Sequence, residues 1–423
     1  MKKVLLNIFV ILLCLLMSIA YISKFIVLLF CINALLALVI CVKSKFSLFS
    51  IKTLTVCYIL IPIAYKIFSN NTYGILNIYQ GDIYSIQINS LIFLYLAINF
   101  FFLNNTKILE NEKKLYLRMN NFEISSQNAI IFSILAIVFI LIFYPPTFLS
   151  NGERFYHLLP GNFWNHFSVI ALLFLLPKMK QRKIYVFPWL FVIIWCLIKS
   201  ERVDAIGLVL LLVMYLWHKK VFHKTTILLF SFLSIILFVS IGYTRQGLNF
   251  TSFSDFLFKL LNQSTSADLA YIFDISIDYP KNFGFLLGKT YQTYLYDAIN
   301  LSSYYNASSM LQNLYGHPGG IFLLSEPYMN FGVFGVVIYS IIENLFYMFL
   351  FSRKSKISII YYLFYLTSVF RYCWYGIEYL ETGTIYLIPI MYGIYYLLSN
   401  MKSPYGSENI RHFALTKFKW KRL

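Results

Sequence analysis

The chain is poor in charged residues. Only 12% of its 423 residues are Asp, Glu, Lys or Arg, and only 17 of them are acidic. A soluble domain carries about 25% charged residues, so much of the usual solvated surface is missing. Hydrophobic residues make up 59% of the chain and the mean hydropathy is +0.69. This composition excludes an ordinary soluble enzyme and indicates a membrane protein.

The signatures of several soluble enzyme classes are also absent. No nucleotide-binding glycine loop follows a strand pattern, and there is no Walker motif, no Asp-x-Asp pair and no His-x-x-x-His pair. The six cysteines show neither metal-ligand spacing nor a disulfide pattern, so we interpret them as structural thiols. These absences argue against ATP-driven transport, and the sequence predicts no metal and no cofactor.

Basic residues exceed acidic ones, and the net charge is +18. In a soluble protein this charge would suggest nucleic-acid binding. In a membrane protein it reflects the preference of Lys and Arg for cytoplasmic loops, so we expect no nucleic-acid partner.

Hydropathy predicts about twelve spanning helices, since a span needs about 20 mostly apolar residues. The expected segments are 4–22, 25–42, 51–67, 86–103, 128–144, 164–176, 186–199, 203–217, 226–243, 323–351, 357–372 and 384–398. The first lacks a small-residue cleavage site, which favours an uncleaved helix over a signal peptide. With a cytoplasmic N-terminus, alternate loops hold most of the basic residues. The sequence therefore predicts an all-α polytopic membrane protein with one domain over 1–423 and a basic cytoplasmic tail at 399–423.

The main segment outside the membrane is a long extracytoplasmic loop at 244–322. Within it, apolar residues recur at helical spacing over 253–263, and Ser252 with Asp255 forms a capping signature. We expect an amphipathic helix there, lying on the bilayer surface or over the bundle.

Three arginines break the charge rule, because the topology places them at outer helix ends: Arg202, Arg245 and Arg371. A guanidinium group matches phosphate oxygens bidentately and stays charged when partly desolvated. Together these residues could cradle a pyrophosphate at the outer leaflet. The alternative is that each reaches lipid headgroups or pairs with a nearby acid, for which the candidates are Glu201, Asp204 and Glu378.

Two further candidates precede the long span at 323–351. His317 lies in a glycine-rich turn and Glu326 follows it, so either could act as a general base on a sugar hydroxyl. The alternative is a loop histidine and a glutamate favoured by the dipole at a helix N-terminus.

The second half of the chain resembles the Wzy-type O-antigen and capsular repeat-unit polymerases. The similar stretches are 285–291 (Phe-Leu-Leu-Gly-Lys-Thr-Tyr) and 326–335 (Glu-Pro-Tyr-Met-Asn-Phe-Gly-Val-Phe-Gly), together with the Ser-Glu-Arg turn at 200–202 and Phe370-Arg371. The resemblance covers roughly 195–375.

This resemblance implies a GT-C-like membrane glycosyltransferase in the bacterial cytoplasmic membrane, with its active site facing outward. Its donor would be a glycan on undecaprenyl pyrophosphate, its acceptor a lipid-linked repeat unit, and a chain-length regulator a possible protein partner. Arg202, Arg245 and Arg371 would stabilise the leaving pyrophosphate, and His317 or Glu326 would orient or deprotonate the acceptor hydroxyl. No metal would be needed.

Two other functions fit the same pattern. An O-antigen ligase shares the chemistry but uses a lipid A-core acceptor. A flippase or transporter for lipid-linked oligosaccharides belongs to another class, although such proteins often show internal repeats and this sequence shows none.

If the arginines hold a pyrophosphate, Arg202→Lys and Arg245→Lys should each lose most polymerisation although the charge is kept, because lysine lacks the bidentate fork. Removing one such contact costs roughly 10²–10³ in rate. Glycan chain length on gels measures this, and normal length in both variants would contradict the cradle.

Overall fold

The computed structural model describes most of the chain between residues 26 and 400. The described ranges are 26–44, 47–78, 85–104, 106–118, 124–143, 163–179, 181–199, 201–219, 264–292, 305–317, 319–353 and 355–400, with isolated positions at 225, 229, 233, 236 and 252.

Helices account for nearly all of these residues. In chain order they are α2 (Ile26–Ser44), α3 (Leu48–Cys57), α4 (Leu60–Ser69), α5 (Ile75–Ile78), α6 (Ser85–Leu103), α7 (Thr106–Arg118), α8 (Ser126–Phe143), α9 (Phe163–Met179), the 3₁₀ turn η3 (Lys183–Tyr185), α10 (Val186–Ile198), α11 (Arg202–Lys219), α14 (Ser264–Phe283), α16 (Ala307–Tyr315), α17 (Ser325–Ser352), α18 (Lys356–Tyr375), α19 (Glu378–Glu381), the π-helical turn η4 (Thr382–Leu387) and α20 (Ile388–Asn400). No strand occurs among the described residues; an isolated bridge joins Ile321 to Tyr375.

Several helices are apolar enough to lie in a membrane. Among the described residues, α2, α6 and α17 are long and apolar enough to cross one alone, and α3 with α4 passes the same test as a pair bent by 41°. Helices α8 to α11 are apolar but shorter. The structure is thus that of an all-α protein with membrane-embedding helices, while the count of twelve spans remains a prediction.

Helices occur at the predicted positions. Of the twelve expected spans, 4–22 and 226–243 fall outside the described ranges, and each of the others coincides with one helix or with two consecutive ones. The amphipathic helix expected at 253–263 also lies outside them. Two helices of the outer loop, α14 and α16, were not predicted, because neither has a long apolar run.

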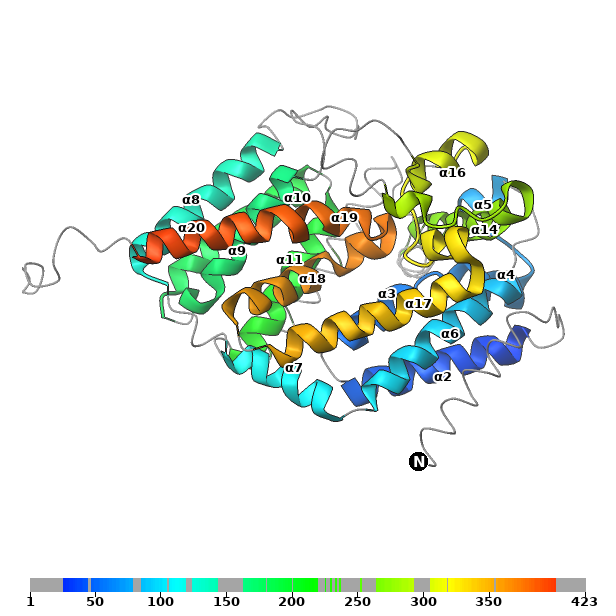
Figure 1. Cartoon of the computed structure of the whole chain (residues 1–423), viewed down its shortest axis with the longest axis horizontal. Coiled ribbons are helices and arrows are strands. Elements are labelled where there is room, and N and C mark those ends of the chain that lie inside the picture. The colour runs from blue at the N-terminus through cyan, green and yellow to red at the C-terminus, as the bar shows by residue number, and fades with distance from the viewer. Residues whose placement is uncertain are drawn as a thin grey trace, which may run out of the picture.

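The helices that flank the membrane segments gather at opposite ends of the bundle. Figure 1 shows α5, α14 and α16 together at one end and α7 at the other, with α2, α6 and α17 running between them. The sequence predicts the first group outside the membrane and α7 on the cytoplasmic side. The structure therefore places the helices predicted on the two sides of the membrane at opposite ends of the bundle.

Amide side chains hold the central helices together. Asn33 on α2 donates to Asn89 on α6, and Asn344 on α17 donates to Asn99 on α6, with N···O distances of 2.8–3.2 Å. Lipid tails supply no hydrophobic force between helices, so such bonds and close packing drive their association. Helices α11 and α18 pack closely at Gly207, because a Cβ added to this residue would lie 1.8 Å from the carbonyl oxygen of Thr367 on α18.

A buried carboxylate fastens α7 to the bundle. Glu112 accepts hydrogen bonds from the Leu48 N–H at the start of α3 (2.9 Å) and from the Tyr362 hydroxyl on α18 (2.6 Å). Burial raises the pKa of the Glu112 carboxyl to about 7, although both hydrogen bonds favour the charged form. The proton on Glu112 therefore helps to keep α7 in place.

The pH dependence of stability follows from this raised pKa. The stabilisation is complete below the ordinary value of 4.5 and is lost as the pH rises to about 7, because the folded state holds the proton more tightly than the unfolded chain. Glu112→Gln keeps a neutral acceptor, so it should match the unmodified protein at about pH 4 and melt higher at about pH 8. Thermal unfolding in detergent measures this. Glu110→Gln, an exposed change on the same helix, is the control; an identical pH slope in Glu112→Gln would refute the assignment.

Candidate functional site

The outer part of α17 is interrupted by a break. Phe331 (φ −139°, ψ 16°) and Gly332 (φ 61°, ψ −142°) leave helical geometry, and the positive φ of Gly332 is one that glycine adopts without strain. The loop that follows α14 fills the break: the N–H groups of Leu286 and Leu287 donate to the carbonyls of Met329 and Asn330 at 3.0 and 3.2 Å. The carbonyls of Met329 and Asn330, which the break leaves without helical partners, are therefore hydrogen-bonded to the loop.

Asn330 is the centre of this contact and is fully buried. Its amide oxygen accepts from the Gly288 N–H at 2.8 Å, and its amide nitrogen donates to the Thr290 hydroxyl (2.7 Å) and the Glu326 carbonyl (2.9 Å). Every polar hydrogen of the side chain is used. One residue thus joins the loop 284–291 to the first turns of α17.

The glycines of this region are required by close packing. A Cβ on Gly335 would lie 1.9 Å from the Pro327 carbonyl oxygen, and one on Gly332 would lie 3.2 Å from the Phe285 ring. The stretches 285–291 and 326–335, which are far apart in the sequence, therefore form one structural unit.

Glu326 lies where α17 begins and α18 ends. It is only 3% exposed, and a Cβ built on Gly376, just after α18, would be 3.8 Å from its Oε2. The segment before it is fixed to α18, because the Ile321 and Leu323 N–H groups donate to the carbonyls of Trp374 (2.8 Å) and Cys373 (3.1 Å).

Tyr291 of the loop also lies near Glu326. Burial, and next the negative charge of Glu326, raise the pKa of the Tyr291 hydroxyl. A phenol that keeps its proton beside a carboxylate can donate a hydrogen bond to a ligand. This pair is therefore suited to binding a hydroxyl group.

His317 is held by the backbone at both ring nitrogens. Nδ1 accepts from the Gly319 N–H at 2.9 Å, so the proton is on Nε2, which donates to the Ser308 carbonyl at 3.0 Å. Burial lowers the pKa of the ring. This neutral imidazole fastens the turn to the start of α16 and has no nitrogen left to act as a base in this arrangement. His317 is therefore the weaker of the two predicted candidates for a general base.

Arg371 pairs with two acids in the turn and first turn of α11. Its Nε and Nη2 contact both carboxylate oxygens of Asp204 at 2.9 Å, and Nη2 also contacts Glu201 at 2.7 Å. The rings of Tyr375 and Tyr379 lie 5.0 and 5.7 Å from the guanidinium carbon. The alternative of pairing with nearby acids is therefore what the structure shows for this arginine.

The other two arginines are less defined. Arg202 is the first residue of α11, between Glu201 and Asp204, but its side chain is outside the described part; Arg245 lies wholly outside it. Convergence of the three predicted arginines is thus untested. Within the described ranges, no group of three or more His, Cys, Asp or Glu side chains could hold a metal ion.

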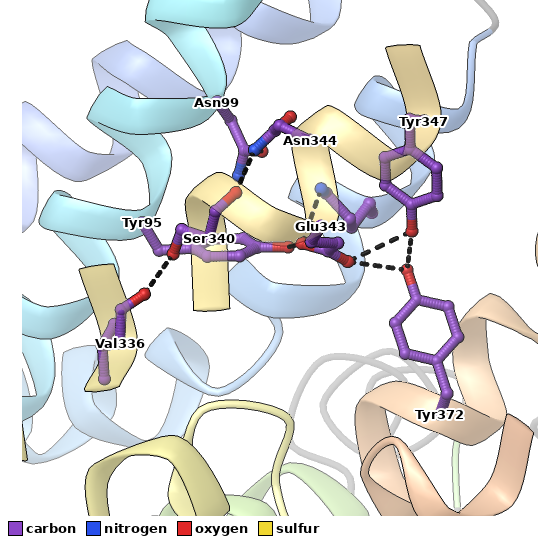
Figure 2. A network of polar contacts seen from close by, with 9 residues as sticks. Tyr95, Asn99, Val336, Ser340, Glu343, Asn344, Tyr347 and Tyr372 are labelled. Atoms are coloured by element: carbon purple, nitrogen blue, oxygen red, sulfur yellow. Dashed lines mark hydrogen bonds and ion pairs between the residues drawn. The ribbon is translucent and has the colours of Figure 1, made fainter. Parts of the chain in front are cut away.

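A buried ion pair that was not predicted lies deeper in the bundle. Lys52 on α3 contacts Glu343 on α17 at 2.9 Å, and its ammonium lies 4.8–5.6 Å from the ring centres of Phe49, Tyr95 and Tyr347. Figure 2 shows Tyr95 approaching Glu343 from one side and Tyr347 and Tyr372 from the other, with O···O distances of 3.0, 3.1 and 3.3 Å. An acid inside an apolar span is the signal that could have identified it.

A cavity of about 430 Å³ connects the two regions. Tyr291, Phe331 and Gly335 line it near the break in α17, and Glu343, Tyr347 and Tyr372 line it farther along. The outer loop, the break and the buried ion pair therefore border one space.

Searches for similar proteins find no matching protein family, no matching curated protein and no matching solved structure.

The joint at Asn330 can be tested directly. Asn330→Ala should lower stability by about 1–3 kcal/mol and speed amide hydrogen exchange in 284–291, because the half-buried Gly288 N–H loses its acceptor. Thermal unfolding and exchange mass spectrometry measure both effects. Asn282→Ala, an exposed change just before the loop, is the control; equal exchange in the two variants would show that the loop does not depend on Asn330.

Proposed function

We propose that this chain is a membrane glycosyltransferase that polymerises lipid-linked oligosaccharide repeat units into an O-antigen or capsular polysaccharide. In this proposal it has twelve spans and a GT-C-like fold in the bacterial cytoplasmic membrane. Its reaction takes place at the outer face, on glycans carried by undecaprenyl pyrophosphate.

The observation that carries the proposal is the joint at Asn330. The two stretches that resemble the polymerase family, 285–291 and 326–335, are bonded to each other through this one buried side chain. Resemblance by chance would give no reason for the two stretches to meet. Their contact sets Tyr291, which lies near Glu326, at the edge of the apolar cavity, an arrangement suited to a substrate with a polar head and a lipid tail.

The proposed reaction is a displacement at an anomeric carbon. A hydroxyl of the acceptor repeat unit forms a bond to that carbon, and the bond from the carbon to the pyrophosphate oxygen breaks. The hydroxyl proton passes to the Glu326 carboxylate, and lipid pyrophosphate leaves with the bonding electrons. Charge accumulates on this leaving group, where fixed cations stabilise the transition state.

The arginines then divide into two roles. Arg202 and Arg245 would contact the pyrophosphate. Arg371 would need to release two carboxylates to do so, and leaving buried charges unpaired is costly. We therefore propose that Arg371 fixes the start of α11, on which Arg202 lies, and that His317 fixes the turn before Glu326.

Gene deletion separates this function from its alternatives. A polymerase mutant should retain single repeat units on the final acceptor, whereas a ligase mutant should accumulate long chains on undecaprenyl pyrophosphate. A flippase mutant should accumulate repeat units on the inner leaflet. Either of the last two outcomes would overturn the proposal.

Complementation of the deletion tests the site. Glu326→Gln should lower the polymerisation rate roughly 100-fold or more, because a general base contributes about 10²–10⁴. Glu110→Gln, an exposed change at the opposite end of the bundle, should restore normal chains. Full-length polysaccharide with Glu326→Gln would remove the carboxylate from the mechanism.

A further inference from the structure

The cavity beside α17 has apolar walls that reach the protein surface. Phe331, Ile338, Ile342 and Phe346 line it from α17, and Leu380 lines it from α19. Ile338 and Ile342 are also 53% and 59% exposed. Since α17 is a candidate span, these side chains face hydrocarbon, and the cavity opens sideways toward lipid rather than toward water.

The inner end of the cavity is polar but electrically neutral. The charges of Lys52 and Glu343 cancel, and the two carboxylate oxygens accept hydrogen bonds from Lys52 and three tyrosines. Breaking a buried pair of this kind is strongly unfavourable. This floor therefore has no charge to offer a ligand, and it marks the depth at which an apolar occupant must stop.

The outer end of the cavity belongs to the candidate site. Tyr291 comes from the loop that Asn330 binds, and Phe331 and Gly335 come from the break in α17. An amphiphile whose chain enters this cavity would have its polar end beside Tyr291 and the loop 284–291. A phospholipid has two chains and no reason to place its headgroup there, whereas a single-chain carrier of a sugar fits both ends.

We propose that this cavity binds the part of the polyprenyl chain nearest the pyrophosphate, and that the Lys52–Glu343 floor limits how much of the chain enters. The identity of the headgroup rests on the proposed function. The site for the chain does not, since it is defined by the apolar walls, the neutral floor and the shared outer end.

Filling the cavity tests the site. The purified protein in detergent is titrated with undecaprenyl phosphate, and bound lipid is measured by native mass spectrometry. Ile338→Trp should weaken binding about fifteenfold or more, because each buried methylene contributes roughly fourfold and the indole displaces at least two. Ile341→Trp is the matched control: it lies on the same helix, is 38% exposed and does not line the cavity. Equal binding by both variants, or equal loss with phosphatidylglycerol, would overturn the proposal.

Removing the floor tests the depth limit. Lys52→Met with Glu343→Met takes away both charges together, which buried pairs tolerate better than losing one. With polyprenyl phosphates of increasing length, affinity for the unmodified protein should stop rising once the chain meets the floor. The double variant should continue to gain about fourfold per added buried methylene. The same plateau in both proteins would refute the limit.

These readouts involve no glycan product. Lost binding in Ile338→Trp together with a deletion phenotype of a flippase would keep the lipid site and reject the polymerase. Normal polymerisation together with unchanged binding in Ile338→Trp would keep the polymerase and reject the lipid site.

Discussion

The arrangement of loop 284–291 against the start of α17 depends on how the break in α17 satisfies its backbone. Within a membrane a carbonyl without a partner costs several kcal/mol, so an interrupted helix must find new donors. Here the donors are the N–H groups of Leu286 and Leu287, and Asn330 adds three side-chain bonds around them. The need to pair the carbonyls at the break therefore fixes the loop, and the loop in turn positions its side chains. The same bonds hold Tyr291, at the end of this loop, near the start of α17, where Glu326 lies.

A similar constraint governs the buried charges. Arg371 pairs with Glu201 and Asp204, and Lys52 pairs with Glu343 on α17. Each cation also lies beside aromatic rings, so neither faces hydrocarbon alone. Around Arg371 the two carboxylates outweigh the single guanidinium, so this cluster offers no net attraction to an anion. In the proposed reaction the pyrophosphate would therefore be bound by other basic residues, for which Arg202 and Arg245 are the candidates.

The sequence predicts the positions of most helices because a long apolar run has few alternatives in a membrane. It cannot predict α14, whose apolar residues are interspersed with polar ones and are buried only by packing against α4, α5 and α17. It leaves the partner of Arg371 open among three acids, since only the fold determines which helix ends meet. It misses the pairing of Lys52 with Glu343, which lie 291 residues apart in the predicted spans 51–67 and 323–351. Local pattern determines helices, whereas pairs across the bundle depend on tertiary structure.

Two glutamates on the same helix illustrate how surroundings decide chemistry. Glu343 has both oxygens occupied by Lys52 and three tyrosine hydroxyls, so its acceptor capacity is spent and its charge is cancelled. Glu326 lies on the other side of the break, in the first turn of α17, where the helix dipole favours the carboxylate. Residue type alone would assign the two acids the same role. Their environments separate them: Glu343 belongs to a neutralised buried network, whereas in the proposed reaction Glu326 is the carboxylate that would receive the proton of the acceptor.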